Sequence, residues 1–121
     1  YFYPEAICEL FRLLKSGGYL AFSLPAKQWA SLLRGNASKG DKTIFVLDSG
    51  ETAEVFSFTY SIDELVKLMG DIGLQLVSAN SIKAGLLTNE ISSAITIAAE
   101  KGCIDYKDLE TVTVAIFYKE D

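Results

Sequence analysis

The sequence predicts a single α/β domain that spans residues 1–121. Apolar residues recur at helical spacing in the first fifteen positions, and a Gly-Gly pair then leads directly into an apolar run at residues 19–24. A second helix-to-strand unit spans residues 61–79, and residues 111–118 are β-branched and aromatic, as is typical of a strand. Helices that alternate with strands indicate an α/β domain.

The composition excludes several classes of protein. Half of the residues are hydrophobic and 22% are charged, which excludes a disordered chain. The net charge of −5 argues against nucleic acid and anionic membranes as partners. The chain has no His, which excludes His-based catalysis and imidazole metal sites. No apolar run approaches the roughly 18 residues of a membrane span, and no secretion signal is recognisable, so we expect a cytoplasmic protein.

Four helices are predicted, at residues 1–15, 27–34, 61–72 and 90–101. The first has Pro4 in its first turn and an apolar stripe of Ile7, Leu10, Phe11 and Leu14, widened by Ala6 and Leu13. The third begins with a capping box, Ser61 to Glu64, and presents Leu65 and Met69 inward. For the fourth we expect Asn89 as the cap, with Ile91, Ile95 and Ala98 facing inward.

The predicted strands differ in their patterns. Residues 19–24 form a continuous apolar run, which predicts a strand covered on both faces, as in a parallel sheet. Residues 43–47 and 53–59 flank a turn at 48–51 and predict a β-hairpin, preceded by a loop at 35–42. Residues 74–79 and 111–118 are also predicted to form strands.

The usual catalytic and ligand-binding motifs are absent from the sequence. The nearest approach to a phosphate loop, GDIG at residues 70–73, ends a helix and is interpreted as a cap. The carboxylate pairs Asp63/Glu64, Asp105/Asp108 and Glu120/Asp121 are interpreted as helix-start or solvated charges. Cys8 and Cys103 lack disulfide or metal-ligand spacing and are interpreted as buried hydrophobes rather than reactive thiols. We assign no catalytic residue and no metal site.

Ser23, Leu24, Pro25 and Trp29 are the candidate substrate-side residues. They lie at the end of the predicted strand at 19–24, and open α/β sheets bind ligands outside the carboxyl ends of their strands. For Trp29 the alternative is that its indole packs the helix at 27–34 onto the sheet, and the pattern favours this alternative.

Two segments resemble a known family. Residues 9–25, ELFRLLKSGGYLAFSLP, resemble the part of class I S-adenosylmethionine-dependent methyltransferases in which a helix ending in R-x-L-K-P-G-G runs into the fifth strand. Ser16 replaces the usual proline. Residues 58–65, FTYSIDEL, followed by GLQLV at 73–77, resemble the helix start that precedes the sixth strand, with Leu74 in place of an aromatic residue. The strand at 111–118 would match the seventh, antiparallel strand.

The resemblance implies the C-terminal half of a Rossmann-like methyltransferase sheet, with an antiparallel last strand. It covers residues 4–25 and 56–80. S-adenosylmethionine is the cofactor of this family, which binds it mainly through a glycine-rich loop after the first strand and an acidic residue that ends the second. Neither has a counterpart here, so no cofactor-binding residue is assigned. Residues around the end of the fifth strand line the substrate side in the family, and residues 83–110 are longer than its usual link, which predicts a helical insertion.

The sequence therefore favours part of a methyltransferase that transfers a methyl group to an acceptor the sequence does not identify. We expect this chain alone to be incomplete, because it begins at Tyr1 and lacks the cofactor motif. Its partners would then be a small-molecule or unidentified methyl acceptor and either a missing N-terminal half or further copies of the chain in a homo-oligomer. The alternative is a non-catalytic binding or oligomerisation module of the same fold, and a third reading is a complete small α/β domain that shares only local motifs.

Overall fold

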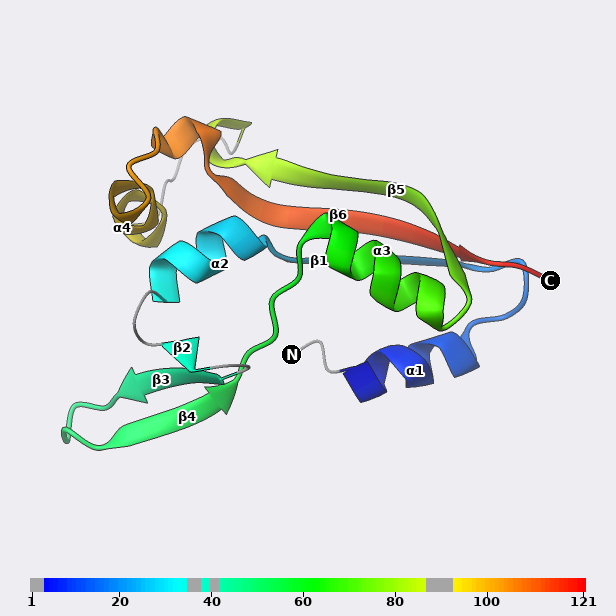
Figure 1. The fold of residues 1–121 in the computed structure, drawn as a ribbon, viewed down its shortest axis with the longest axis horizontal. Helices are drawn as coiled ribbons and strands as arrows, with labels where there is room; N and C mark the ends of the chain where they lie inside the picture. Colours follow the sequence, from blue (N-terminus) through cyan, green and yellow to red (C-terminus); the bar gives the residue numbers. More distant parts are fainter. Residues whose placement is uncertain (1–3, 35–37, 40–41, 87–92) are drawn as a thin grey trace.

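The computed structural model describes residues 4–34, 38–39, 42–86 and 93–121 (Figure 1). Its helices are α1 (Pro4–Leu13), α2 (Lys27–Arg34), α3 (Ile62–Asp71) and α4 (Ser93–Lys101), with short 3₁₀ helices η2 (Ala84–Leu86) and η3 (Tyr106–Asp108). Its strands are β1 (Tyr19–Pro25), β2 (Ser38–Lys39), β3 (Lys42–Val46), β4 (Thr52–Phe56), β5 (Leu74–Lys83) and β6 (Glu110–Lys119). This succession of helices and strands confirms the predicted α/β class.

The main sheet has the strand order β1-β6-β5. β6 is antiparallel to both of its neighbours, so β1 and β5 run parallel to each other on either side of it. Phe117 of β6 pairs with Leu20 of β1 and with Leu76 of β5. The last strand of the chain therefore forms the centre of this sheet, and the prediction that it is antiparallel is confirmed.

The prediction that the first strand is covered on both faces, in a parallel sheet, is wrong. All strand pairs among the described residues are antiparallel, and Tyr19, Ala21 and Ser23 of β1 are exposed while Leu24 is buried. The reason is that α1 and α3 lie on the same face of the sheet (Figure 1). An apolar run predicts that both faces of the strand are covered. Among the described residues, no helix or strand covers the face of β1 that carries Tyr19, Ala21 and Ser23.

The main core fills the space between the sheet and α1 and α3. Its fully or nearly fully buried members come from both helices and all three strands: Ile7, Leu24, Leu65, Met69, Leu74, Ala115 and Phe117. Phe117 is inaccessible to solvent and stacks on Phe22 with ring centroids 5.9 Å apart. Ile7 confirms the predicted inner face of the first helix, but Leu10, which the same stripe placed inward, is 38% exposed.

The Gly-Gly pair links α1 to β1. Gly17 has a φ of +76° and its N–H donates to the carbonyl of Lys119 at 2.8 Å. A β-carbon on Gly18 would lie 2.7 Å from the carbonyl oxygen of Lys15, so no side chain fits there without a shift of the backbone. The predicted positive φ is present at Gly17, but α1 ends at Leu13, before the pair, so the two glycines form the turn into β1 rather than the end of the helix. The predicted helical residues 1–3 lie outside the described residues.

The unit formed by α3 and β5 follows its prediction closely. The side chain of Ser61 accepts from the N–H of Glu64 and the carboxylate of Glu64 accepts from the N–H of Ser61, which confirms the capping box. Leu65 and Met69 are buried, as their spacing predicts. β5 continues to Lys83, beyond the predicted end at residue 79.

A second small sheet has the order β2-β3-β4, and its β3–β4 hairpin confirms the predicted one. β4 alternates between exposed and half-buried side chains, as expected for a strand with one solvated face. β2 lies inside the segment predicted as a loop, because Ser38 and Lys39 pair with Thr43 and Lys42 through the backbone, which composition does not reveal. Residues 35–37 and 40–41 of that loop lie outside the described residues.

A second core joins α2 to the last third of the chain. Its buried members are Ala84, Ile95, Ala98, Ala99 and Leu109, and Trp29, Leu32 and Tyr106 pack against it. The predicted inward positions of Ile95 and Ala98 are confirmed, whereas Asn89 and Ile91 lie outside the described residues. The helical insertion expected at residues 83–110 is therefore present as η2, α4 and η3.

The interpretation of the two cysteines as buried hydrophobes is wrong. Cys8 and Cys103 are both exposed and unpaired. α1 turns its neighbour Ile7 inward and leaves Cys8 on the solvent side, and Cys103 lies in the turn after α4 with a φ of 51°.

Among the described residues no helix is long and apolar enough to cross a membrane.

Candidate functional site

The candidate site lies at the carboxyl end of β1, where the chain turns into α2. Pro25 ends the strand, and the N–H of Ala26 donates to the carbonyl of Thr111 at 2.8 Å. Gln28, in the first turn of α2, accepts from the N–H of Glu110 at 2.9 Å. These two bonds fix the start of α2 against the start of β6, so the side chains at this corner have fixed positions.

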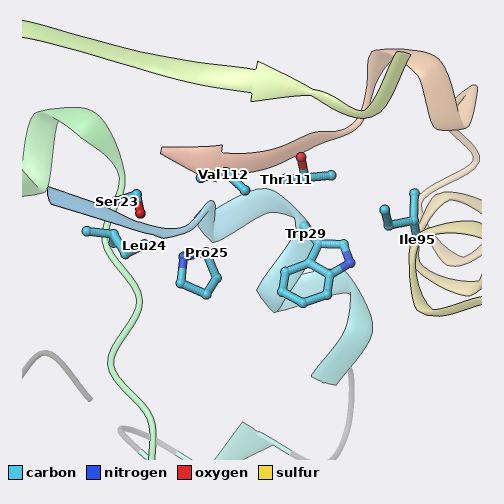
Figure 2. Close-up of a pocket in the computed structure, with 7 residues that line it drawn as sticks. All are labelled: Ser23, Leu24, Pro25, Trp29, Ile95, Thr111 and Val112. Carbon is cyan, nitrogen blue, oxygen red and sulfur yellow. The ribbon is translucent and has the colours of Figure 1, made fainter. Parts of the chain in front are cut away.

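The four residues predicted from the sequence lie together in one cavity of about 340 Å³, here called the β6 cavity (Figure 2). It is lined by Ser23, Leu24, Pro25, Trp29, Ile95, Thr111 and Val112. Most of its wall is apolar. The hydroxyl of Thr111 donates to the carbonyl of Ile82 at 3.0 Å, so Ser23 supplies the remaining side-chain hydroxyl of the lining.

Trp29 lines the predicted cavity, but it does not pack against the main sheet core, as the favoured alternative expected. Its indole packs against the second core rather than against the main sheet core, and it also lines the β6 cavity. The indole nitrogen is buried and has no hydrogen-bond partner among the described residues. Figure 2 shows this nitrogen on the ring edge that faces Ile95 and α4.

Two further cavities adjoin the β6 cavity, and Pro25 lines all three. The first, of about 370 Å³, is lined by Ser23, Leu24, Pro25, Arg34, Ser57, Phe58 and Thr59. The second, of about 310 Å³, lies between α2 and β3 and is here called the hairpin cavity; it is lined by Pro25, Trp29, Ala30, Arg34, Thr43, Ile44, Phe45 and Ser57. Three cavities therefore adjoin the carboxyl end of β1, as expected for the edge of a sheet that binds a ligand.

Arg34 is the cation of this region, and the sequence pattern did not single it out. Its guanidinium donates to the backbone carbonyl of Ser57 at 3.0 Å and to the hydroxyl of the same residue. Partial burial lowers the pKa of Arg34 from its ordinary value. No carboxylate that the structure describes forms an ion pair with it.

The sequence pattern did not select Thr43 either, because a single threonine in a strand is typical of any β-strand. The residue is only 7% exposed, and its hydroxyl oxygen has no hydrogen-bond partner among the described residues. Such a buried, unsatisfied hydroxyl costs about 1–3 kcal/mol. Thr43 lines a cavity because the hairpin packs beside α2. This packing leaves no signal in the sequence, so the sequence does not identify Thr43 as a candidate site residue.

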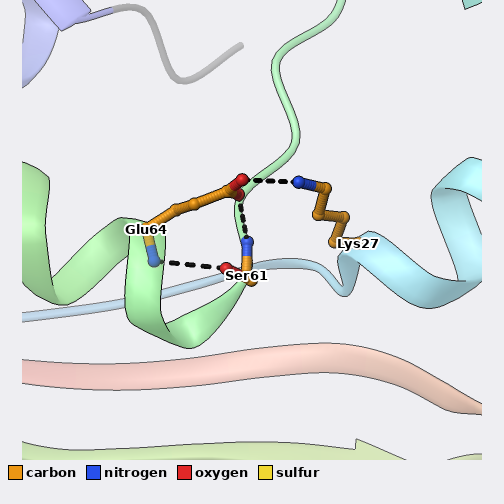
Figure 3. A network of polar contacts seen from close by, with 3 residues as sticks. All are labelled: Lys27, Ser61 and Glu64. Carbon is orange, nitrogen blue, oxygen red and sulfur yellow. Dashed lines mark hydrogen bonds and ion pairs between the residues drawn. The ribbon is translucent and has the colours of Figure 1, made fainter.

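The carboxylate pair Asp63/Glu64 lies beside a separate cavity of about 410 Å³ between α2 and α3. Glu64 forms an ion pair with Lys27 at 2.6 Å and accepts from the N–H of Ser61 at 2.7 Å (Figure 3). These two contacts, the one with Lys27 first, hold the pKa of Glu64 below its ordinary value. Glu64 is therefore a structural carboxylate that caps α3 and ties it to α2, not a proton donor.

The composition of the site, rather than any similarity to a known protein, indicates the kind of molecule that it can bind. No family model and no curated protein matches the chain. Among the described residues no group of three or more His, Cys, Asp or Glu side chains is placed to hold a metal ion. The three cavities around Pro25 have apolar walls, hydroxyls and one guanidinium, which is a lining that suits a small, largely apolar molecule.

Proposed function

We propose that the chain forms the acceptor-binding half of a class I S-adenosylmethionine-dependent methyltransferase fold. The observation that carries the proposal is the placement of β6, reversed between two strands that are parallel to each other. The resemblance assigns β1, β5 and β6 to the fifth, sixth and seventh strands of that fold, and it expects the seventh to be antiparallel. The observed arrangement of these three strands supports this assignment.

The position of the cavities supports the same proposal. The resemblance places substrate-side residues at the end of the fifth strand, and Ser23, Leu24, Pro25 and Trp29 line one cavity at the end of β1. Methyl transfer is an in-line displacement, for which positioning of the acceptor supplies much of the rate. In this proposal the apolar walls exclude water from the acceptor and the hydroxyl of Ser23 orients it.

The described residues do not fit the cofactor. The linings of the three cavities around Pro25 contain no carboxylate for ribose hydroxyls and no glycine turn for close backbone approach. We therefore assign no step of the transfer to a cofactor held by these residues. The proposal places S-adenosylmethionine on a segment outside this chain.

The first test is the coding sequence directly upstream of Tyr1. We expect it to encode a strand followed by G-x-G-x-G, with an acidic residue about 20 positions later. Calorimetric titration of the 121-residue chain with S-adenosylmethionine is the complementary measurement, and we expect no binding. An upstream sequence without this pattern, or micromolar binding by the chain alone, would contradict the proposal.

A second test uses the longer protein and two matched variants. Val112→Trp fills the β6 cavity, whereas Ile97→Trp adds the same bulk at an exposed position of α4 that lines none of the cavities described. In an assay of labelled methyl transfer to cell extract, we expect Val112→Trp to raise the extract concentration that gives half-maximal labelling and Ile97→Trp to leave it unchanged. Equal effects of the two variants would argue against the acceptor site.

One observation favours the alternative, a non-catalytic oligomerisation module. The face of the main sheet opposite α1 and α3 exposes apolar side chains, among them Tyr19, at 63%, and Val114, at 37%. Exposed apolar surface of this kind marks association sites in many proteins. Light scattering distinguishes the two functions, because a dimer that strengthens with concentration favours the module and a monomer at every concentration argues against it.

A further inference from the structure

The lining of the hairpin cavity includes polar groups whose hydrogen-bonding capacity the described residues fill only in part. The hydroxyl of Thr43 is buried there without a partner among the described residues. The guanidinium of Arg34 lines the same cavity, and within the described part of the chain two of its five N–H donors are occupied, both by Ser57. A folded protein seldom leaves a buried hydroxyl without an acceptor, and the N–H groups of Arg34 that do not donate to Ser57 belong to the lining of the same cavity.

We propose that the hairpin cavity binds a small apolar monocarboxylate. Its carboxylate would accept hydrogen bonds from Arg34 and Thr43, and its hydrocarbon part would lie against Pro25 and Phe45. The inference concerns binding by this chain, so it stands whether or not the chain takes part in methyl transfer.

The chemistry of the lining selects this class of ligand. A guanidinium presents parallel N–H donors that match the two oxygens of a carboxylate, and a threonine hydroxyl adds a third donor. The remaining wall is mostly apolar and includes the indole of Trp29. An inorganic oxyanion would leave this apolar wall unfilled, and a cavity of about 310 Å³ lies at the lower end of the range for ligand pockets, which favours a small molecule.

The electrostatics agree with this geometry. Burial lowers the pKa of Arg34, and a bound carboxylate would compensate for the lost hydration of its charge. The net charge of the whole chain is −5, so an anion is not attracted from a distance. Binding must therefore depend on contacts inside the cavity, which makes it sensitive to single substitutions.

The chain contains a built-in reporter for the test. Trp29 is its single tryptophan and lines the cavity, so its fluorescence can be excited selectively while 3-phenylpropionate is added. We expect a saturable change in emission, confirmed by calorimetry. The neutral isostere 3-phenylpropionamide should bind at least about tenfold more weakly, because it cannot form the charge-assisted pair, and inorganic phosphate should not compete.

Three variants locate the site. Arg34→Gln should weaken 3-phenylpropionate binding about tenfold or more, whereas Arg12→Gln, which removes the other arginine from an exposed pair with Glu9, should leave it unchanged. Thr43→Val should weaken binding without lowering the melting temperature, because it removes a hydroxyl that forms no hydrogen bond with any residue the structure describes.

Several results would overturn the inference. One is equal binding of the acid and the amide, and another is unchanged binding by Arg34→Gln in a protein that still melts cooperatively. Absence of any response to 3-phenylpropionate in both fluorescence and calorimetry would also overturn it. None of these outcomes bears on cofactor binding, so the proposed function and this inference fail separately.

Discussion

The ammonium of Lys119 lies 4.0 Å from the centre of the Phe11 ring. The same group donates to the backbone carbonyls of Phe11, at 2.8 Å, and Leu14, at 2.9 Å. Both carbonyls belong to the carboxyl end of α1, where a helix leaves acceptors without partners and carries the negative end of its dipole. Lys119, from the last strand of the chain, therefore caps the C-terminus of the first helix, although Lys119 and Phe11 are 108 residues apart in the sequence.

Lys119→Met should lower the free energy of unfolding by about 1–3 kcal/mol, because it leaves the two carbonyls without a charged donor. Urea denaturation followed by circular dichroism measures the change. Lys67→Met is the control, since the ion pair of Lys67 in the described part of the chain is an exposed one with Asp71 within α3. Its loss should cost less than about 0.5 kcal/mol. Equal losses in the two variants would contradict the structural role of Lys119.

Phe117→Ala should lower the free energy of unfolding by about 3–5 kcal/mol. Phe117 is inaccessible to solvent at the centre of the main core, so truncation leaves a cavity that neighbours cannot fill. Phe117→Leu should recover part of this loss. Thermal melting measures both, and Phe45→Ala, at a position that is 51% exposed, should cost less than the core truncation. A similar loss at Phe45 and Phe117 would place the core elsewhere.

Two glycines should respond to alanine in opposite directions. Gly70→Ala should raise the free energy of unfolding by about 0.5–1 kcal/mol, because Gly70 lies in α3 and a β-carbon there meets nothing within 4 Å. Gly18→Ala should lower it, because the new β-carbon would lie 2.7 Å from the carbonyl of Lys15. Chemical denaturation of both variants checks the signs, and a stabilising Gly18→Ala would contradict the tight turn after α1.

Glu64 should make stability depend on pH. Its pKa is lowered in the folded state, first by Lys27 and then by the N–H of Ser61. A carboxylate with a lowered folded pKa stabilises the protein above its unfolded pKa of about 4.3, and this contribution is lost as pH falls through the folded value. Since the side chain is 47% exposed, we expect about 0.2–1 kcal/mol.

Urea denaturation of the parent and Glu64→Gln at pH 6 and at acid pH measures this contribution. The difference between the two proteins should be present at pH 6 and should shrink as the pH falls below about 4. In a Lys27→Met background the difference at pH 6 should already be smaller, because the main cause of the lowered pKa is gone. A difference that does not change with pH would contradict the network of Figure 3.

Local signals in the sequence located most of the elements. The capping box at Ser61, the Gly-Gly turn and the β-branched last strand act within a few residues, and all three are present in the structure. The same reasoning placed Ser23 and Trp29 at one strand end, and these side chains line one cavity. It failed for β2 and for the exposed cysteines, where pairing or helix orientation decides the outcome.

Arg34 and Thr43 show why the sequence could not predict part of the candidate site. Arg34 ends a helix and Thr43 lies in a hairpin, and neither residue has a pattern of its own. Their common cavity exists because Ser57 accepts from Arg34 across 23 residues and holds the hairpin segment beside α2. A contact of this range depends on packing between elements, which short-range periodicity does not encode.

The sequence by itself determined the α/β class, the positions of the helices and the corner at Pro25, because these depend on propensity, caps and spacing along the chain. The tertiary structure decided the strand order of the main sheet, with β6 at its centre, the single covered face of that sheet and the polar lining of the hairpin cavity. The physical reason is that an apolar side chain records only a need for burial. Which partner satisfies that need is settled when the whole set of elements packs together.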